Sequence, residues 1–292
     1  METVFRDYSP RGVKFYYVYK ALAHPEYMSY LNPFTLEERL MHVAEAKRTL
    51  GMKIPWIVDN MENTLKEALS KRFSNAEMII DVQGKVIGKR AWSRPEEIRE
   101  ALTRWVGPVE NPTRVEDLNI QTAPPPKAAA SGVVPRIDRP DSAQMRPLIV
   151  KPESSEWDEP FYAKLRAEAQ LDVLKNGKGQ LYLGFHLDPL YNVHWNNLVR
   201  PIRVLIEAPP GVTLSSTELS GPEVEEESDI DPREFLLDIV AEQADEPIRV
   251  STFYYACNDE EGWCKPLTQR YLVYLKMDWE GGSTHGLPQF VP

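Results

Sequence analysis

The sequence has few cysteines: Cys257 and Cys264 are the only two among its 292 residues. Two cysteines exclude a disulfide-rich scaffold, although they are enough for a single bridge. No stretch comes near the 18 or so apolar residues that a membrane-spanning helix needs. The first residues, METVFRD, are polar, so no charged and then apolar signal peptide opens the chain. We therefore expect a globular protein without a membrane span.

The chain also lacks an excess of positive charge, since its 34 Lys and Arg face 44 Asp and Glu for a net charge of −10. An acidic protein repels the phosphates of nucleic acids and anionic lipids, so neither is expected as its main partner. The charge is uneven along the chain. Residues 1–110 hold 17 basic and 15 acidic residues, a net of +2, which leaves 17 and 29, a net of −12, for residues 111–292.

Six prolines fall between residues 121 and 147, in the segment QTAPPPKAAASGVVPRIDRPDSAQMRP. A proline-rich stretch of this kind is extended and semi-rigid, and it builds no core of its own. The length of the chain suits two domains of about 100–200 residues each. We therefore predict a first domain over residues 1–110, a linker over residues 111–150 and a second domain over residues 151–292.

The first domain alternates between strand and helix patterns. Thr35 and Glu38 form a capping box that begins a helix, and Gly51 ends it. Proline followed by acidic residues begins another helix at Pro95. The predicted order is β-α-β-α-β-β-α, with strands at residues 13–20, 55–59, 76–80 and 85–90 and helices at residues 35–50, 63–73 and 95–106. This order matches the later part of a thioredoxin fold.

Three motifs in this domain resemble the iodothyronine deiodinase family: YVY followed by AHP at residues 17–25, TLEERL at residues 35–40 and VDNMEN at residues 58–63. The resemblance covers roughly residues 5–106 and implies an α/β thioredoxin-like domain, truncated at its first strand. That family carries a selenocysteine or cysteine after the first strand, whereas this chain has no cysteine before Cys257. The proline that usually precedes the hairpin is also missing, since residues 74–76 read SNA.

Reductive cleavage requires a selenol or a thiolate, so the first domain is expected to be catalytically silent and to act as a docking surface. His24 has two interpretations. The resemblance implies a hydrogen-bond donor beside the substrate, while the absent nucleophile favours a loop histidine that caps backbone groups. Asp59 and Asn63 are expected to form a strand-end and N-cap pair that shapes the turn into the next helix.

The second domain begins with a predicted amphipathic helix over residues 156–175, with its apolar residues on one face. Beyond it the pattern changes to alternating strands, and Pro209, Gly211 and Gly282 lie in predicted turns. Short alternating strands separated by turns are typical of an antiparallel β-sandwich. The predicted strands lie at residues 181–187, 202–207, 248–256 and 271–277.

Both cysteines lie in one predicted hairpin, residues 253–268, which reads FYYACNDEEGWCKPLT. This segment resembles the amino-terminal periplasmic domain of thiol:disulfide interchange proteins of the DsbD type, which have a segment like YQGCADAGFCYPP. The resemblance covers about residues 178–280 and implies an immunoglobulin-like sandwich with Cys257 and Cys264 as a redox pair on adjacent strands. Six residues separate the cysteines here, against five in that pattern, so the loop geometry differs.

The chemistry of the pair has two interpretations. A thiolate on an edge hairpin can attack a partner's disulfide and be released when the second thiol attacks the mixed disulfide. Lys265 is expected to favour the Cys264 thiolate, which would make Cys264 the more reactive thiol. The acidic residues 259–261 are expected to disfavour the thiolate of Cys257. The alternative is a structural staple, since closing a loop of eight residues stabilises by roughly 2.5 kcal/mol.

Two other clusters are weaker candidates for a site. The acidic segment at residues 221–234 lacks the spacing of a calcium-binding loop, and we expect a solvated, self-repelling loop. His186 and His194, together with two thiolates, would suit zinc or copper(I). Their spacing of eight is not a standard ligand spacing, and each is expected to form hydrogen bonds where a strand meets a loop. We therefore predict no metal and no cofactor.

The function favoured by these patterns is thiol–disulfide exchange or electron relay through Cys257 and Cys264. The expected partner is a redox protein, either thioredoxin-like or a membrane electron donor. One alternative is a non-catalytic interaction protein with a structural Cys257–Cys264 disulfide. A second is a thioredoxin-like reductase or peroxidase whose nucleophile lies upstream of Met1. A disulfide favours a periplasmic or extracellular protein if the amino terminus is truncated, and otherwise the polar start favours the cytoplasm.

Overall fold

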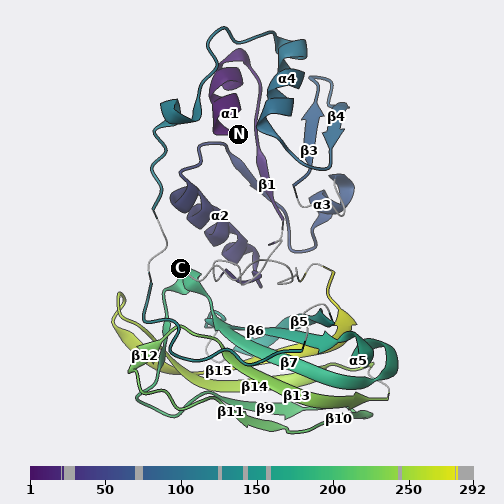
Figure 1. Cartoon of the computed structure of the whole chain (residues 1–292), viewed down its shortest axis with the longest axis vertical. Helices are drawn as coiled ribbons and strands as arrows, with labels where there is room; N and C mark the ends of the chain where they lie inside the picture. Colours follow the sequence, from purple (N-terminus) through teal and green to yellow (C-terminus); the bar gives the residue numbers. More distant parts are fainter. Residues whose placement is uncertain are drawn as a thin grey trace. The chain divides into compact units, whose positions relative to one another are not determined.

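The computed structural model forms two compact units (Figure 1). Unit 1 comprises Met1–Ala21 and Thr35–Pro125, and unit 2 comprises Leu22–Phe34 and Pro126–Pro292. The division near residue 125 falls inside the segment predicted as a linker. The structure describes residues 1–20, 22, 30–69, 75–123, 127–140, 144–155, 159–242, 245–279 and 281.

Unit 1 consists of short strands and four α-helices within its described residues. Its helices are α1 (Glu2–Tyr8), α2 (Leu36–Leu50), α3 (Thr64–Leu69) and α4 (Pro95–Val106), and its strands are β1 (Tyr17–Tyr19), β2 (Trp56–Val58), β3 (Glu77–Ile80) and β4 (Val86–Arg90). The predicted ends of α2 are confirmed, since the Thr35 side chain accepts a hydrogen bond from the Glu38 amide (3.2 Å). Gly51 ends the helix in the left-handed region, with φ of 63°.

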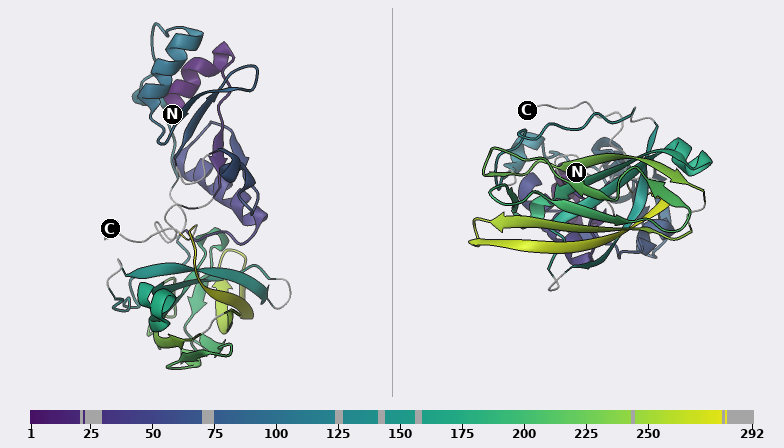
Figure 2. Two further views of the ribbon diagram at one scale, coloured as in Figure 1. Left: turned by 90° about the vertical axis from the view of Figure 1, so that its right-hand side faces the viewer. Right: turned by 90° about the horizontal axis from the view of Figure 1, so that it is seen from below.

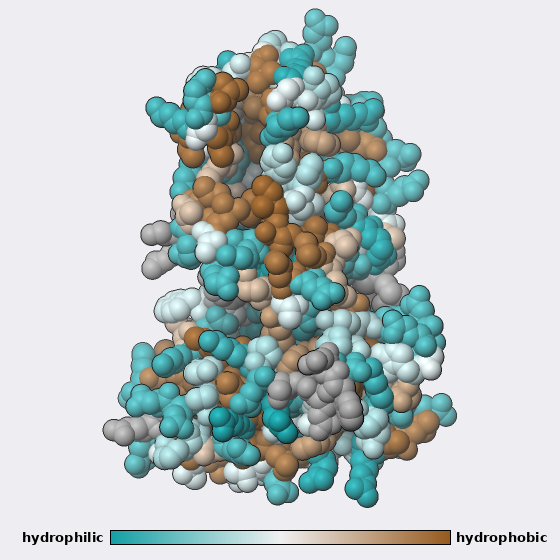
Figure 3. All heavy atoms as spheres, turned by 180° about the vertical axis from the view of Figure 1, so that it is seen from behind, coloured by the Kyte–Doolittle hydropathy of each residue, from teal (hydrophilic) through white to brown (hydrophobic). Residues whose placement is uncertain are grey.

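The strands of unit 1 form two separate pairs in the described part of the chain. β1 and β2 are parallel, and β3 and β4 form an antiparallel hairpin. Val18 and Ile57 are 39% exposed on one face of the β1–β2 pair, and Leu36 and Leu40 are exposed on α2. Figure 3 shows hydrophobic side chains gathered on the surface of this unit. Unit 1 therefore presents apolar surface beyond its own small core.

Asp7 connects α1 to two other segments of unit 1. Its carboxylate accepts hydrogen bonds from the Thr113 hydroxyl (2.5 Å) and the Thr113 amide (3.1 Å), and it pairs with Arg99 of α4. Burial raises the pKa of Asp7, but the hydrogen bonds from Thr113 and Arg99 outweigh it, so the net pKa lies below its ordinary value of 3.8.

We expect this attachment to weaken in acid. A carboxylate with a lowered pKa in the folded state contributes stability above its ordinary pKa, and the contribution disappears as the pH falls through the lowered value. The protection factor of the Thr113 amide, which compares observed hydrogen exchange with the intrinsic rate at the same pH, should therefore fall below about pH 3.8. An Asp7→Asn variant should exchange faster already at neutral pH, with a smaller further change in acid. Equal protection of Thr113 in both proteins would contradict this role for Asp7.

In its described residues, unit 2 is built on an 11-stranded sheet. The backbone path runs β10-β13-β7-β6-β5-β15-β14-β8-β12, with β9 beside β14 and β11 beside β9. Its strands are β5 (Met145–Ser155), β6 (Ala163–Gln170), β7 (Lys178–Leu187), β8 (His194–Asn196), β9 (Arg203–Glu207), β10 (Val212–Leu214), β11 (Glu218–Ser220), β12 (Ser228–Asp229), β13 (Arg233–Ala241), β14 (Ile248–Asn258) and β15 (Trp263–Met277), with one short helix, α5 (Leu171–Asn176).

The sheet curls so that distant strands face each other across one core (Figure 2). The ring of Phe185 on β7 lies 6.3 Å from the ring of Tyr271 on β15, although two strands lie between β7 and β15 in the sheet. The Tyr254 hydroxyl of β14 accepts a hydrogen bond from the Ala163 amide of β6 (3.1 Å), again across two intervening strands. Unit 2 is therefore predominantly β, and its curled sheet is compatible with the predicted β-sandwich.

The predicted helix over residues 156–175 is wrong within the described residues. Residues 163–170 form β6, and only Leu171–Asn176 is helical. Ala163, Leu165, Ala167 and Ala169 alternate along the core face of this strand, which is the period of two that a strand requires. The polar residues between them suggest the solvated face of a helix, but Lys164 and Glu168 are buried and Arg166 is partly buried.

Ion pairs explain how the other face of β6 is buried. Lys164 lies 2.6 Å from Asp188, and both side chains are at most 3% exposed. Arg166 pairs with Glu168 on the same strand at 2.6 Å. Charges are buried only when they are paired. A partner such as Asp188, far along the chain, cannot be read from the local pattern of β6.

Part of the predicted linker is attached to unit 2. The Asp231 carboxylate accepts hydrogen bonds from the backbone amides of Gly132, Val133 and Val134, at 2.7 to 2.9 Å. Arg136 forms two hydrogen bonds to Glu234, both at 2.7 Å. None of the described residues 127–140 belongs to the buried apolar core, and the segment is held instead by backbone amides and by two arginines, Arg136 and Arg139, the latter 3.6 Å from Glu168.

Candidate functional site

The β14–β15 hairpin places the two cysteines directly opposite each other. Cys257 pairs with Cys264 in the register, and the two form a disulfide with Cα atoms 4.1 Å apart. Opposite residues that exchange no backbone hydrogen bonds approach to about 4.5 Å, which suits a bridge across two strands. The turn is closed by the Gly262 amide, which donates to the Asn258 carbonyl (2.9 Å). Gly262 adopts φ of 72°, a conformation that favours glycine.

The two sulfur-bearing residues differ in exposure. Cys257 is 3% exposed, because β14 is flanked by β15 on one side and by β8 on the other. Cys264 is exposed, since the pairing of β15 with β5 begins only at Gln269 in the described chain. Cys264 is thus the more accessible of the two residues, and attack of a thiolate on its sulfur would make Cys257 the departing group.

The position of Lys265 corrects one expectation. Successive residues of a strand point to opposite faces, so the Lys265 side chain lies on the face away from Cys264. Its Nζ donates a hydrogen bond to Glu159 (2.5 Å) and lies 4.3 Å from the centre of the Trp263 ring. Burial raises the pKa of Glu159, but hydrogen bonds from Lys265 and Tyr162 outweigh it and the net pKa is lowered. The Lys265 Nζ also lies 5.3 Å from the centre of the Tyr162 ring, so the lysine charge is engaged by a carboxylate and two aromatic rings.

The acidic residues of the turn also have specific partners. Asp259 contacts the His194 ring, with 3.2 Å between Oδ1 and Nε2. Glu260 accepts a hydrogen bond from the Asn192 amide (3.2 Å), and the neighbouring Glu261 accepts one from the Trp263 indole (2.6 Å). The negative charge nearest to Cys257 in sequence, that of Asp259, is therefore paired with an imidazole.

The two histidines occupy different strand pairs. His194 lies on β8 directly opposite Cys257, and it is 6% exposed. His186 lies on β7 opposite Lys164 of β6. Within the residues that the structure describes, no three His, Cys, Asp or Glu side chains converge as metal ligands. The sequence identified both histidines but gave no indication that one of them lies beside the disulfide.

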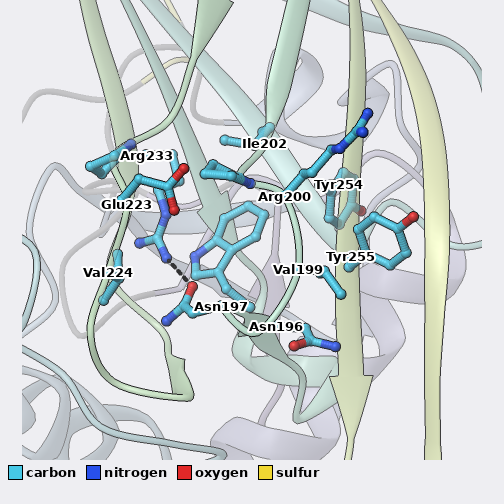
Figure 4. A pocket seen from close by; sticks show the side chains of 13 residues that line it. Asn196, Asn197, Val199, Arg200, Ile202, Glu223, Val224, Arg233, Tyr254 and Tyr255 are labelled. Atoms are coloured by element: carbon cyan, nitrogen blue, oxygen red, sulfur yellow. Dashed lines mark hydrogen bonds between the residues drawn. The ribbon is translucent and has the colours of Figure 1, made fainter.

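A pocket lies next to the hairpin, and the sequence gave no indication of it (Figure 4). Its lining includes Asn196, Val199 and Tyr255, with Glu223 and Arg233 on the opposite side in the view. The Asn196 amide also donates to the Cys264 sulfur at 3.7 Å. Asn196 therefore contributes to both the pocket and the surroundings of the disulfide.

Part of the acidic segment at residues 221–234 is buried, which corrects the prediction of a solvated loop. Asp229 is fully buried and forms two hydrogen bonds with Arg233, at 2.7 and 2.9 Å. Burial raises the pKa of Asp229, but the hydrogen bonds from Arg233 and Asn197 outweigh it and the net pKa is lowered. Glu234 has a lowered pKa for the same kind of reason, with Arg136 as its main partner. Asp229, Asp231 and Glu234 hold strands and the attached segment together, whereas the glutamates at positions 223, 225, 226 and 227 are exposed, as predicted.

Two predicted positions in unit 1 have different outcomes. Asp59 is buried at the end of β2 and accepts hydrogen bonds from the amides of Leu65 (3.0 Å) and Lys66 (2.8 Å), so its role at the start of α3 is confirmed. Asn63 adopts φ of 56°, and the amide of Thr64 donates instead to the Asn60 side chain (3.0 Å). His24 lies outside the described residues.

No protein-family model, curated protein or solved structure matches the chain. Among the described residues, no helix combines the length and the apolar content needed to cross a lipid bilayer. The candidate site therefore depends on the geometry of the hairpin itself.

Proposed function

We propose that the chain performs thiol–disulfide exchange or electron relay through Cys257 and Cys264. The observation that carries the proposal is the asymmetric disulfide, with an exposed Cys264 and a buried Cys257 on adjacent strands. An exposed sulfur gives a partner access, and a buried one is kept close to resolve the mixed disulfide. The partner is a dithiol protein, thioredoxin-like or a membrane electron donor.

The exchange balances without a further reagent. A thiolate of the partner attacks the Cys264 sulfur, a new S–S bond forms, and the Cys257–Cys264 bond breaks with its electron pair on Cys257. The second thiol of the partner then attacks the mixed disulfide and releases Cys264 as a thiolate. The pair has gained two electrons, and the partner leaves as a disulfide.

The proposal includes the two family resemblances. Unit 2 is proposed as an immunoglobulin-like sandwich related to the DsbD amino-terminal domain, and its curled antiparallel sheet supports this. Unit 1 is proposed as a deiodinase-like thioredoxin fold without a nucleophile, supported by its strand and helix order. The exposed Val18 and Ile57 support a role for unit 1 as a docking surface.

A redox titration of the full chain in thiol/disulfide buffers tests the proposal. We expect a midpoint potential between about −180 and −270 mV, the range of exchanging dithiols. A bridge that stays oxidised to below about −300 mV would favour the structural staple and overturn the exchange function. The readout is the number of free thiols in the protein at each potential. A Cys257→Ala/Cys264→Ala double variant, treated with the same buffers, gives the background of this assay.

A further inference from the structure

His194 is the ionisable neighbour of the disulfide on its buried side. It faces Cys257 across β8 and β14, and directly opposite residues have Cβ atoms about 5 Å apart. His194, Cys257 and Cys264 are consecutive partners across three strands, so their side chains share one face of the sheet. The buried sulfur therefore lies between an imidazole and the exposed sulfur.

Both ring nitrogens of His194 contact atoms that only accept hydrogen bonds. Nδ1 lies 2.9 Å from the Trp195 carbonyl oxygen, and Nε2 lies 3.2 Å from Oδ1 of Asp259. A neutral imidazole has one N–H and satisfies one of these acceptors, whereas the imidazolium satisfies both. Both acceptors are therefore satisfied at once only when the ring beside Cys257 carries two N–H groups.

We propose that the His194 imidazolium, held by Asp259, stabilises the thiolate that leaves at Cys257 when a partner thiolate attacks Cys264. The inference rests on the proposed exchange function and adds a charge-stabilising residue and a positioning residue to it. The electron pair of the broken S–S bond stays on Cys257 as a thiolate, and no proton is transferred in this step. In thiol–disulfide exchange, a leaving sulfur whose thiolate form is stabilised departs faster.

The other charged groups around this ring have separate partners. Glu260 in the same turn accepts from Asn192, and Asp229 of β12 pairs with Arg233. Asp229 faces Trp195 in the register, so it lies on the opposite side of β8 from His194. Asp259 is therefore the carboxylate that holds the imidazolium.

The test measures reduction of the disulfide by dithiothreitol in the full chain over a range of pH. We expect His194→Gln to slow reduction roughly three- to tenfold near neutral pH, because the leaving thiolate loses its counter-charge. Asp259→Asn should also slow the reduction of the disulfide, by a smaller factor. Glu260→Gln is the matched control, since it removes one charge from the adjacent residue, and it should reduce at the rate of the unaltered protein.

A second measurement separates charge stabilisation from a structural effect. In a Cys264→Ser background, ultraviolet absorption reports the pH at which Cys257 becomes a thiolate, and His194→Gln should move that pH upward. If His194→Gln fails to fold, Asp259→Asn keeps the test open, because the Asp259 side chain is 80% exposed. Unchanged reduction rates and an unchanged Cys257 titration in both variants would overturn the inference.

The two proposals fail in different ways. A midpoint potential of the unaltered chain below the exchanging range would remove the exchange function, whatever the variants do. A potential within that range, with His194→Gln matching the unaltered protein, would remove only the role of His194.

Discussion

A Cys257→Ser variant is expected to accumulate a stable mixed disulfide through Cys264 when the full chain is incubated with oxidised glutathione. The remaining thiol is exposed, so it reacts, and no second cysteine is left to resolve the product. The reciprocal Cys264→Ser variant keeps only Cys257, which is 3% exposed, and its rate of adduct formation should be lower by a factor of about ten or more. Mass spectrometry of the glutathione adduct over time measures both rates.

The unaltered chain, reduced first, is the control for this experiment. It should pass through the glutathione adduct transiently and finish as the internal disulfide, because Cys257 lies opposite Cys264 and resolves the adduct. Equal adduct rates in the two single variants would contradict the assignment of Cys264 as the attacked sulfur. A stable adduct on the unaltered chain would contradict the resolving role of Cys257.

Local signals account for what could be predicted in unit 1. The start of α2 is determined by Thr35 and Glu38, which are three residues apart, and its end by Gly51. The start of α4 at Pro95 is likewise local, because proline suits the first turn of a helix. Such boundaries depend on residues within one turn of the chain, and a single sequence contains all of that information.

Unit 2 shows where local signals fail. The strand β6 was mistaken for a helix because Lys164 and Glu168 look like a solvated face, yet both are buried beside oppositely charged groups. The same reason explains Asp229, whose arginine partner lies four residues away on another strand. A buried charge is recognisable only when its partner is known, and the partner is set by the sheet topology.

The placement of Cys257 and Cys264 on one hairpin was predictable, but the groups that surround them were not. The turn between Cys257 and Cys264 is local, so the sequence placed both on one hairpin. Lys265 and Cys264 are adjacent on one strand, so the alternation of side chains places them on opposite faces and the lysine does not favour the Cys264 thiolate. His194 and Asn196 come from β8, which meets β14 only after the sheet has folded. No spacing rule connects them to the cysteines.

Replacing Asp229 with asparagine is expected to lower the unfolding free energy of unit 2 by about 3–5 kcal/mol. The Arg233 side chain is 3% exposed, and Asp229 is the carboxylate that balances its charge, with Oδ1 and Oδ2 both engaged. The substitution keeps the shape but removes the negative charge, so Arg233 remains buried with only neutral acceptors, the Asp231 carbonyl and the Asn197 amide. Urea unfolding followed by circular dichroism and tryptophan fluorescence measures the loss.

Glu153→Gln is the matched control in the same unit. Glu153 also pairs with an arginine, Arg249, but at 3.5 Å and with the arginine side chain 60% exposed. An exposed pair of this kind contributes about 1 kcal/mol or less, because water screens both charges. The contrast between the variants isolates burial as the cause, since each loses one carboxylate charge. Similar losses in both would show that Arg233 is hydrated in solution and that its pair with Asp229 contributes no more than a surface contact.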